Sequence, residues 1–354
     1  MSLIARYIGK TVLLNTLLVL LVLVALTGIF GFIGELDDVG RGSYSVSTAM
    51  IYVLLRMPGS AYELFPPAVL LGSLLGLGGL ATHSELTVMR SAGISIMQIA
   101  RSVALIGLIL MLLVALVGEF LMPDAERRAH EVRAAALSDR VSLSSQTGYW
   151  AKSGPLFVNI KSVLPDTTLV DISVYDFDEG TLKSVVQAEK AQQQNDGHWR
   201  LESIKRTVFN AASLRSETAE MEIWPLLVNA ELLKGLSVPA ESMSASNLVN
   251  QILYLKRNQL DSRVTELALW TKLANPVSTL IMLMLSLPFV FASQRAGGVG
   301  QKMFVGILLG IGYFLLNRLV THVGLANGLS PAVSTLIPLI LFSLMAMLGL
   351  QRIT

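Results

Sequence analysis

The sequence predicts an α-helical membrane protein with six spans and one polar β-domain inserted between the third and fourth. Only 15% of the 354 residues are charged and 53% are hydrophobic, whereas a soluble domain is about 25% charged. The apolar residues form long uncharged blocks of span length. A single polar segment, rich in residues that favour strands, separates the first three blocks from the last three.

Six runs are long enough to cross a bilayer, which takes about 20 apolar residues. The first is too long for a cleaved signal peptide, and no small-residue cleavage site follows it. The second is broken by charges and prolines, but its half from 64 to 82 is uncharged. The expected spans are Thr11–Gly34, Val46–Thr82, Ser102–Gly118, Leu273–Gln294, Met303–Asn317 and onward, and Ala332–Leu350.

Lysine and arginine predict the orientation, because they are in excess in cytoplasmic loops. With the N-terminus inside, the first outer segment holds Arg41 against three acids, Glu35, Asp37 and Asp38. We therefore expect both termini in the cytoplasm and the polar insertion outside. The short inner segments hold one acid, Glu85, against Arg6, Lys10, Arg90, Arg101, Arg295, Lys302 and Arg352.

The polar insertion runs from about Glu119 to Arg263. Short strands separated by turn residues favour a sandwich or an open half-barrel, and helices are expected on either side, at 125–137 and 246–260. The expected domains are therefore 1–122 (three spans), 123–263 (the β-domain with its flanking helices) and 264–354 (three spans). The expected strands are Thr147–Ala151, Leu156–Ser162, Leu169–Phe177, Leu182–Ala191, Trp199–Ile204 and Glu217–Trp224.

The sequence contains no motif for catalysis or for a cofactor. It has no phosphate-binding loop of the type G-x-x-x-x-G-K-[ST] and no G-x-S-x-G elbow. It has no cysteine, and its four histidines lack ligand spacing, so we expect no metal site. The net charge of +2 gives no global field that favours nucleic acid. We expect a non-catalytic chain without cofactor.

Charged residues in or near the spans are candidates for function, because such charges are costly. They are Arg56, Glu63, Lys272 and Arg318. The alternative is that they reach to the membrane surface, which is the stronger reading for Lys272 and the weaker one for Arg318. Arg56 and Glu63 are seven residues apart on one helical face, where they would pair through neighbours or line a polar cavity.

The inner loop between spans two and three predicts a short amphipathic helix near 84–93. Thr82 and Glu85 fit a capping box, and Gly93 can end the helix in the left-handed conformation. A helix of about two turns is unstable alone and must dock on something. Two interpretations stay open: a helix on the membrane surface, or a coupling helix in a groove of a cytoplasmic ATPase. The coupling residues are Ser84, Glu85, Leu86, Met89 and Arg90.

The order of motifs along the chain resembles the lipopolysaccharide export permeases, the LptF/LptG family. The resemblance covers nearly the whole chain, although no single motif decides it. It implies an inserted periplasmic β-jellyroll-like domain and a location in the bacterial inner membrane. The segments that carry it are Tyr7–Thr11, Leu70–Gly78, Ser84–Met89 with Ala92-Gly93, Gly148–Lys152, and Tyr254–Lys256 through Trp270–Lys272.

The resemblance further implies one permease half of an ATP-binding-cassette exporter. Its partners would be an LptF-like paralogous permease, an LptB-like ATPase dimer and an LptC-like single-span protein with a β-jellyroll. Lipopolysaccharide would leave the outer leaflet of the inner membrane and pass to a periplasmic β-jellyroll bridge. One departure stands out. Where family members often carry lysines after span one, this chain has acids, and Arg41 is the nearest basic residue.

A cavity for such a lipid needs apolar walls and cations at its outer rim, because the lipid has acyl chains and phosphates. Arg41 and Arg318 are the expected cations, with Arg318 ranked first. Small residues four apart in span five would let that helix pack closely and move as a gate. The residues assigned to the cavity and gate are Arg41, Phe30, Phe32, Gly306, Gly310, Phe314 and Arg318.

Two other functions remain open from the sequence. A gradient-driven secondary transporter would show inverted repeats and carboxylates buried at mid-membrane, and Glu63 alone is weak support for one. A scaffold for envelope assembly would have the same spans and β-domain but no transport of its own.

Overall fold

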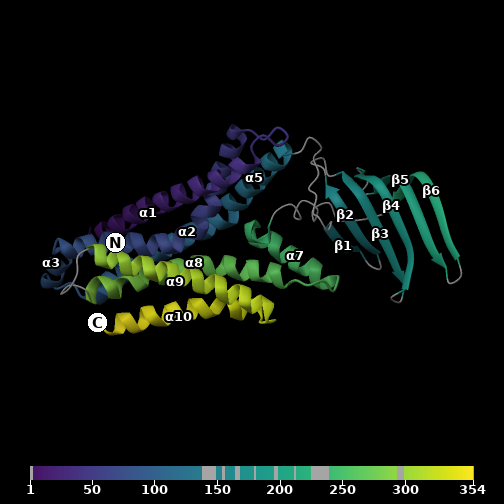
Figure 1. Cartoon of the computed structure of the whole chain (residues 1–354). Coiled ribbons are helices and arrows are strands. Elements are labelled where there is room, and N and C mark those ends of the chain that lie inside the picture. Colours follow the sequence, from purple (N-terminus) through teal and green to yellow (C-terminus); the bar gives the residue numbers. More distant parts are fainter. Residues whose placement is uncertain are drawn as a thin grey trace.

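The computed structural model describes residues 3–137, 149–153, 156–163, 168–178, 181–194, 198–210, 213–224, 239–292 and 299–353. Figure 1 shows a bundle of long helices with a β-sheet beyond one end of it. Both chain termini and the short helix α3 (Glu85–Ser91) lie at the other end. We call these ends of the bundle the β-domain end and the terminal end.

Six helices are long and apolar enough to cross a membrane, which confirms the expected spans. Most extend several residues beyond the uncharged runs, because a helix can continue while its charged side chains reach toward the polar boundary. Within the described ranges, these helices are α1 (Leu3–Glu35), α2 (Val46–Thr82), α4 (Ile96–Leu116), α8 (Arg263–Ala292), α9 (Val299–Ala326) and α10 (Pro331–Gln351).

The second run forms one uninterrupted helix, α2, although it contains three prolines. Pro66 has no N–H to give to the carbonyl of Tyr62 four residues earlier, and Asn275 Nδ2 on α8 donates to that oxygen at 2.8 Å. The reverse occurs in α8. There Pro276 leaves the carbonyl of Lys272 without its helical donor, and the Tyr62 hydroxyl donates to it at 2.9 Å. Each helix thus bonds the carbonyl that proline frees in the other, as an apolar environment requires.

Glycines bring other helices unusually close to α2. Gly72 lies against the backbone of α1 at Thr16, where any Cβ would collide. Gly306 of α9 lies against Leu74 of α2 with no room for a side chain, while a Cβ at Gly310 would meet its neighbour at an ordinary 3.6 Å. The close packing expected in span five therefore occurs at Gly306, and α9 has more room beside α2 one turn further on.

Helix α4 continues through one π-helical turn, Val117–Leu121, into the polar helix α5 (Met122–Leu137). Gly118 in this turn lies against the ring of Tyr62, where a side chain would not fit. π turns reorient side chains and often mark functional positions. Here the Glu119 carboxylate accepts a hydrogen bond from the backbone N–H of Ala245 at 2.8 Å. The turn thus connects α4 to the start of α7 (Ala245–Arg257).

The return from the β-domain consists of a short turn, η3 (Ala240–Ser242), and then α7. Leu248 and Ile252 of α7 are buried, as its apolar face predicts. The helix expected at 246–260 begins one residue earlier, at Ala245. Ser244 is the cap, because its backbone is extended and its side chain accepts from the N–H of Asn247.

The β-domain contains one antiparallel sheet of six strands, each paired with the next along the chain. All six lie where the sequence predicts them. The fifth ends later than expected, and the sixth begins earlier. The sequence predicted either a sandwich or an open half-barrel. Among the described strands, this consecutive order in one sheet agrees with the open arrangement. The strands are β1 (Tyr149–Ser153), β2 (Leu156–Val163), β3 (Leu169–Asp178), β4 (Thr181–Gln193), β5 (Trp199–Asn210) and β6 (Ser213–Trp224).

One face of the sheet is an apolar core. Its members include Val158, Ile172, Val186 and the fully buried Trp199. The two connections to the helices, 138–148 and 225–238, lie outside the described residues, and so does part of the strand expected at 147–151. The sheet is therefore a second core, separate from the core of the helical bundle.

The bond from Asn275 to the freed carbonyl predicts a specific coupling between two substitutions. Asn275→Ala leaves the carbonyl of Tyr62 without a donor and should cost about 1–3 kcal/mol of stability. In a Pro66→Ala background the helix supplies its own N–H, so the same substitution should cost clearly less. Thermal unfolding of the four variants in detergent measures the coupling. Pro338→Ala in α10 is the control background, and an equal cost in both backgrounds would contradict the assignment.

Candidate functional site

Helix α3 is anchored to the terminal end of the bundle by its own apolar residue. Leu86 is fully buried and belongs to the core that also contains Ile8 of α1 and Ile99 of α4. Met89 packs against this core and is partly buried. Leu86 therefore holds α3 to the spans. The side chain is therefore not exposed to a partner, because a helix of seven residues needs it to dock on its own chain. Its predicted role in coupling stays a prediction.

Glu85 is held from a different span. The Tyr7 hydroxyl of α1 donates to Glu85 Oε2 at 2.8 Å, across 78 residues of sequence. Together with Leu86, this bond fixes α3 to α1 as well as to α2 and α4. Movement of α3 would therefore be passed directly to span one.

The two ends of α3 differ from each other in how well the sequence predicts them. The capping box is wrong: Thr82 donates to the carbonyl of Gly78, and Ser84 begins the helix in the left-handed conformation without a side-chain cap. The C-terminal end is confirmed. Gly93 has φ +90°, its N–H donates to Arg90, and the N–H of Ile94 donates to the carbonyl of Met89. This is the Schellman pattern that a glycine at this position favours.

The outward surface of α3 remains available. Ser84 and Arg90 are exposed, and so is Val88, with 64% of its surface accessible. A shallow hollow of about 410 Å³ lies beside this surface. It is lined by Arg90, Gly93, Ile94, Ser95, Ile96, Met97 and Ile353. The loop after α3 and the C-terminal segment thus form one continuous exposed surface with the outward side of α3.

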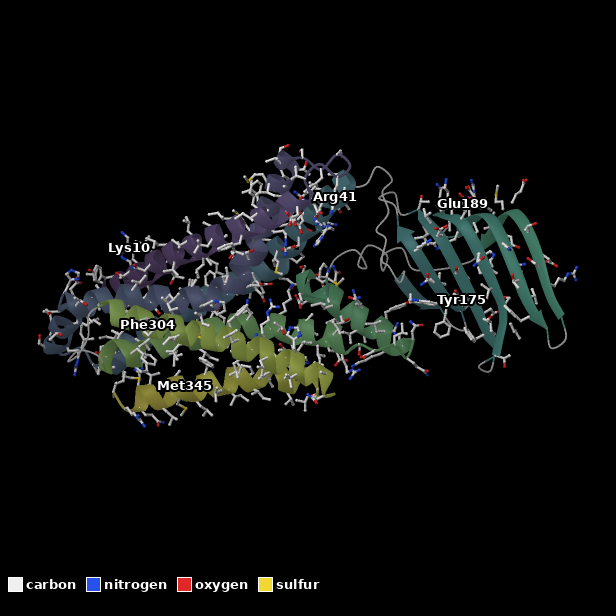
Figure 2. The ribbon with its side chains drawn as sticks, in the orientation of Figure 1. Lys10, Arg41, Tyr175, Glu189, Phe304 and Met345 are labelled. Atoms are coloured by element: carbon white, nitrogen blue, oxygen red, sulfur yellow. The ribbon has the colours of Figure 1, made fainter. Side chains whose placement is uncertain are left out.

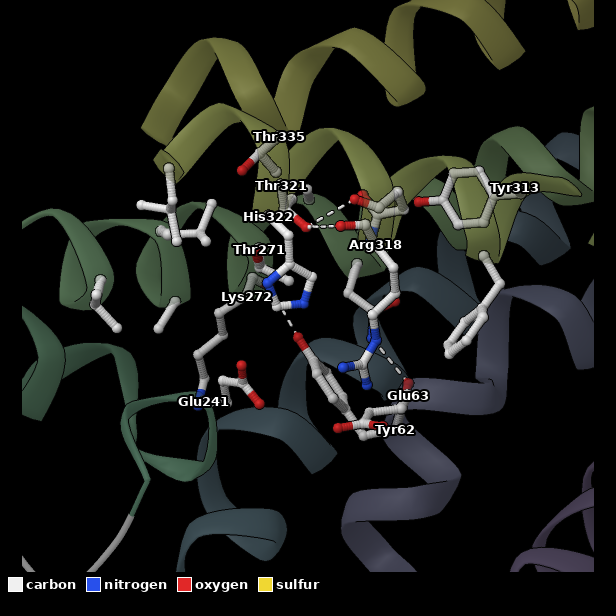
Figure 3. Close-up of a pocket in the computed structure, with 18 of the residues that line it drawn as sticks. Tyr62, Glu63, Glu241, Thr271, Lys272, Tyr313, Arg318, Thr321, His322 and Thr335 are labelled. Carbon is white, nitrogen blue, oxygen red and sulfur yellow. Dashed lines mark hydrogen bonds between the residues drawn. The ribbon is translucent and has the colours of Figure 1, made fainter. Parts of the chain in front are cut away.

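A second, more enclosed feature lies toward the β-domain end, where a cavity of about 280 Å³ opens between α2, α8 and α9 (Figure 3). Glu241 of η3 also lines it. The guanidinium of Arg318 points toward Tyr62 and Glu63 (Figure 3), and it lies over the ring of Phe314, with 5.5 Å from its carbon to the ring centroid. The other polar lining residues are Thr271, Lys272, Asn275, Tyr313, Asn317, Thr321, His322 and Thr335.

The charged residues of span two divide between two environments. Glu63 lines the cavity, which supports the cavity reading for this residue. Arg56 instead lies near Glu126 of α5, with 3.4 Å between Nε and Oε2, and stacks over Tyr52. The two residues therefore act separately, because they meet different neighbours.

Lys272 does not reach to the membrane surface, contrary to the stronger reading of the sequence. It is buried, its ammonium donates to the carbonyl of Met243, and it lies 3.7 Å from the Glu119 carboxylate. Since Glu119, which is partly exposed, also bonds the start of α7, this pair holds that helix start against α4 and α8. These two partners compensate the charge of the buried ammonium. They also hold the segment that returns from the β-domain in place.

The cavity residues predicted in and just after span one do not line the cavity. Phe30 is exposed on α1 and Phe32 packs near Tyr44 and Tyr52. Arg41 is exposed and is held by Asp38, with 2.5 Å between the charged atoms. Arg41 thus already has a carboxylate partner, and this partner is one of the acids that follow span one.

Arg133 on α5, which sequence reasoning did not single out, is the centre of an ion-pair cluster at the β-domain end. It binds Glu35 at 2.9 Å and Asp38 at 2.6 Å, both at the end of α1. The Tyr44 hydroxyl also donates to Glu35 at 2.8 Å. Burial of the ring, and then this bond, raise the pKa of Tyr44 to about 12. The only sequence signal was the surplus of acids at 35–38, which needs a cation from elsewhere.

These features define a class: a six-span membrane protein with a β-domain between its third and fourth spans, an exposed short helix beside a shallow hollow at the terminal end, and a charged cavity toward the β-domain end. A family model described as the lipopolysaccharide export system permease LptF/LptG matches residues 6–352. The chain therefore belongs to the LptF/LptG family of lipopolysaccharide export permeases.

Two relatives illustrate the similarity. The chain is 34% identical to the lipopolysaccharide export system permease protein LptG of Escherichia coli K12 over 350 residues, which are 98% of this chain and 97% of the relative. It is 32% identical to the protein of the same name from Haemophilus influenzae KW20/Rd over 349 residues, 98% of each chain.

The anchoring of α3 predicts opposite effects for two neighbouring apolar residues. Leu86→Asp puts a charge into the core and should cost at least about 3 kcal/mol of stability. Val88→Asp, two residues away on the exposed side, should stay within about 0.5 kcal/mol. Thermal unfolding of both variants in the same detergent measures the difference. Equal melting temperatures would show that α3 is not docked through Leu86.

Proposed function

We propose that this chain is one permease subunit of an ATP-binding-cassette exporter. It extracts lipopolysaccharide from the outer leaflet of the bacterial inner membrane and passes it to a periplasmic bridge of β-jellyroll domains. The observation that carries this proposal is the placement of α3, rigidly docked at the terminal end, with the cavity and the β-domain toward the other end. The terminal end then faces the cytoplasm and the β-domain lies in the periplasm, in agreement with the basic inner loops.

The proposed partners follow from the surfaces that the chain leaves uncovered. The exposed side of α3 and the hollow beside it would seat an LptB-like ATPase, two copies of which serve the whole exporter. Figure 2 shows side chains standing out along α1, and its exposed apolar residues include Leu18, Leu21, Ile29 and Phe30. An LptF-like paralogous permease and the span of an LptC-like protein would cover part of this surface, and lipid the rest.

The force from the ATPase would travel through two contacts already described. Glu85 is bonded to Tyr7 of α1, and Leu86 lies in the core shared by α1 and α4. A displacement of α3 would therefore move spans one and three together. Since α1 also packs directly against α2 at Gly72, the same displacement would reach the walls of the cavity.

The cavity provides the lipid contacts in this proposal. Arg318 is the cation for a lipid phosphate, because its guanidinium faces the cavity and has no carboxylate bound to it in the described part of the chain. The ring of Phe314 supports this guanidinium by stacking against it. Arg41 ranks lower, since Asp38 already binds it. Gly306, closely packed on α2, would act as the fixed point about which the outer half of α9 moves as a gate.

Copurification tests the proposal as a whole. We expect an ATPase subunit to purify with this chain in fixed stoichiometry, and the complex to hydrolyse ATP. The isolated chain should show no turnover, because its sequence has no phosphate-binding loop. A gradient-driven transporter or a scaffold would purify without an ATPase, and turnover by the isolated chain would equally exclude the proposal.

Charge reversal tests the assignment of the phosphate contact. In the assembled complex, Arg318→Glu should slow ATP-driven release of lipopolysaccharide by about tenfold or more, as loss of a charge-assisted bond predicts. Arg41→Glu is the matched control and should have a much smaller effect. Photo-crosslinking from neighbouring positions checks that substrate contact is lost at Arg318 alone. Normal release by both variants would mean that acyl-chain contacts hold the lipid.

A further inference from the structure

Most charges near the spans at the β-domain end are paired within the chain. Arg133 binds two acids of the α1 terminus, and Arg41 binds one of them. The other two pairs are Arg56–Glu126 and Lys272–Glu119. Pairing is the usual state of charges in or near a membrane, because an isolated charge there is expensive.

Three charged side chains depart from this pattern. Glu63, Glu241 and Arg318 make no ion pair within 4 Å and no side-chain hydrogen bond with any other described residue. The guanidinium of Arg318 lies over the ring of Phe314 and points toward Glu63 without reaching ion-pair distance (Figure 3). They come from three different elements, α2, η3 and α9, yet all three line the same cavity (Figure 3). Three unpaired charges around one cavity indicate a ligand that carries the complementary charges.

The signs of these charges restrict the ligand. Arg318 requires an anion and fits a phosphate. The two carboxylates would repel a ligand that is only anionic, and they require a cation that can donate hydrogen bonds. The Lys272 ammonium also lines the cavity, but it is already bonded to Met243 and lies beside Glu119. Within the described residues, the chain therefore places no cation at ion-pair distance from Glu63 or Glu241.

The rest of the lining is apolar and adds a third requirement. It is formed by Pro67, Met122, Val264, Leu267, Phe314 and Leu325. A free metal ion or a free phosphate would leave these walls unused. An acyl lipid whose headgroup joins a phosphate to a primary ammonium meets all three requirements at once.

We propose that this cavity is a binding site for a zwitterionic glycerophospholipid of the ethanolamine type. Its phosphate binds Arg318, its ammonium donates to Glu63 and Glu241, and the first part of its acyl chains lies along the apolar walls. The site shares the phosphate contact at Arg318 with the proposed function and extends it to a bilayer lipid that is not the exported one. Its test needs neither partner nor nucleotide, so either proposal can fail alone.

The test is lipid binding by the purified full-length chain, measured by native mass spectrometry. Three lipids with identical acyl chains are titrated: phosphatidylethanolamine, phosphatidylcholine, whose quaternary ammonium donates no hydrogen bond, and phosphatidylglycerol, which has no cation. We expect affinity to fall in that order, with about a tenfold difference between the first and the last. Equal affinity for phosphatidylglycerol and phosphatidylethanolamine would overturn the proposal.

Variants assign the preference to the three residues. Glu63→Gln combined with Glu241→Gln keeps the shape of both side chains, and it should remove the preference for the ethanolamine headgroup. Arg318→Gln should weaken the binding of all three lipids by about tenfold and keep the order of their affinities. Glu220→Gln, on the exposed β6 strand, is the control and should change nothing. Melting temperatures verify folding, and a preference that survives the double variant would also overturn the proposal.

A further experiment with lipopolysaccharide distinguishes the phospholipid site from the proposed export function. The double Gln variant keeps Arg318, so it should still release lipopolysaccharide in the assembled complex while losing its phospholipid preference. If it loses both activities together, the carboxylates serve the exported lipid and the separate phospholipid site is wrong. If Arg318→Glu exports normally but wild type still selects ethanolamine, the phospholipid site stands and the proposed phosphate contact in export does not.

Discussion

The crossing of α2 and α8 depends on two backbone carbonyls that proline leaves without donors. Pro66 and Pro276 create one such carbonyl each, and Asn275 and Tyr62 bond the carbonyl on the opposite helix. An unpaired carbonyl in an apolar environment costs free energy. Each helix therefore depends on the other to supply the donor that its proline removes. This mutual dependence fixes the relative height of the two helices. Because Tyr62, Asn275 and Lys272 also line the cavity, its geometry is set by the same contact.

The two segments that lead to and from the β-domain are each fastened by charges. Arg133 ties the departing helix α5 to the end of α1 through two carboxylates. Lys272 and Glu119 tie the returning segment to α4 and α8. Both fastenings are at the β-domain end, whereas α3 is fixed at the terminal end by Leu86 and Tyr7. Movement of either end is therefore transmitted through helices that are anchored at both ends.

The sequence predicted the elements of this fold well because each depends on a local pattern. Uncharged length identified the six spans, and β-branched and aromatic residues between turns identified all six strands. Contacts between distant residues could not be read in this way. Glu35 and Arg133 are 98 residues apart, and Lys272 and Glu119 belong to different spans. The capping box failed for another reason: the motif was present, but Thr82 bonds back into α2 instead.

Of the candidate site, the sequence correctly indicated that Glu63 and Arg318 were unusual, because their cost is visible in any apolar run. It could not show that they face the same cavity, since that depends on how α2 and α9 pack. It could not show where Leu86 packs, because an apolar residue on a short helix looks the same whether it docks on its own chain or on a partner.

The consecutive order of the β-strands has a consequence for how the protein is made. Every pairing in the sheet joins neighbours in sequence, so each new strand can add to the one before it as the chain emerges on the domain's side of the membrane. Such local pairing closes short loops and favours fast folding. The sheet can therefore be complete before α8 is synthesised, and a folded domain of this kind cannot slip back through the membrane. Span four would then insert against a domain that is already committed to its side.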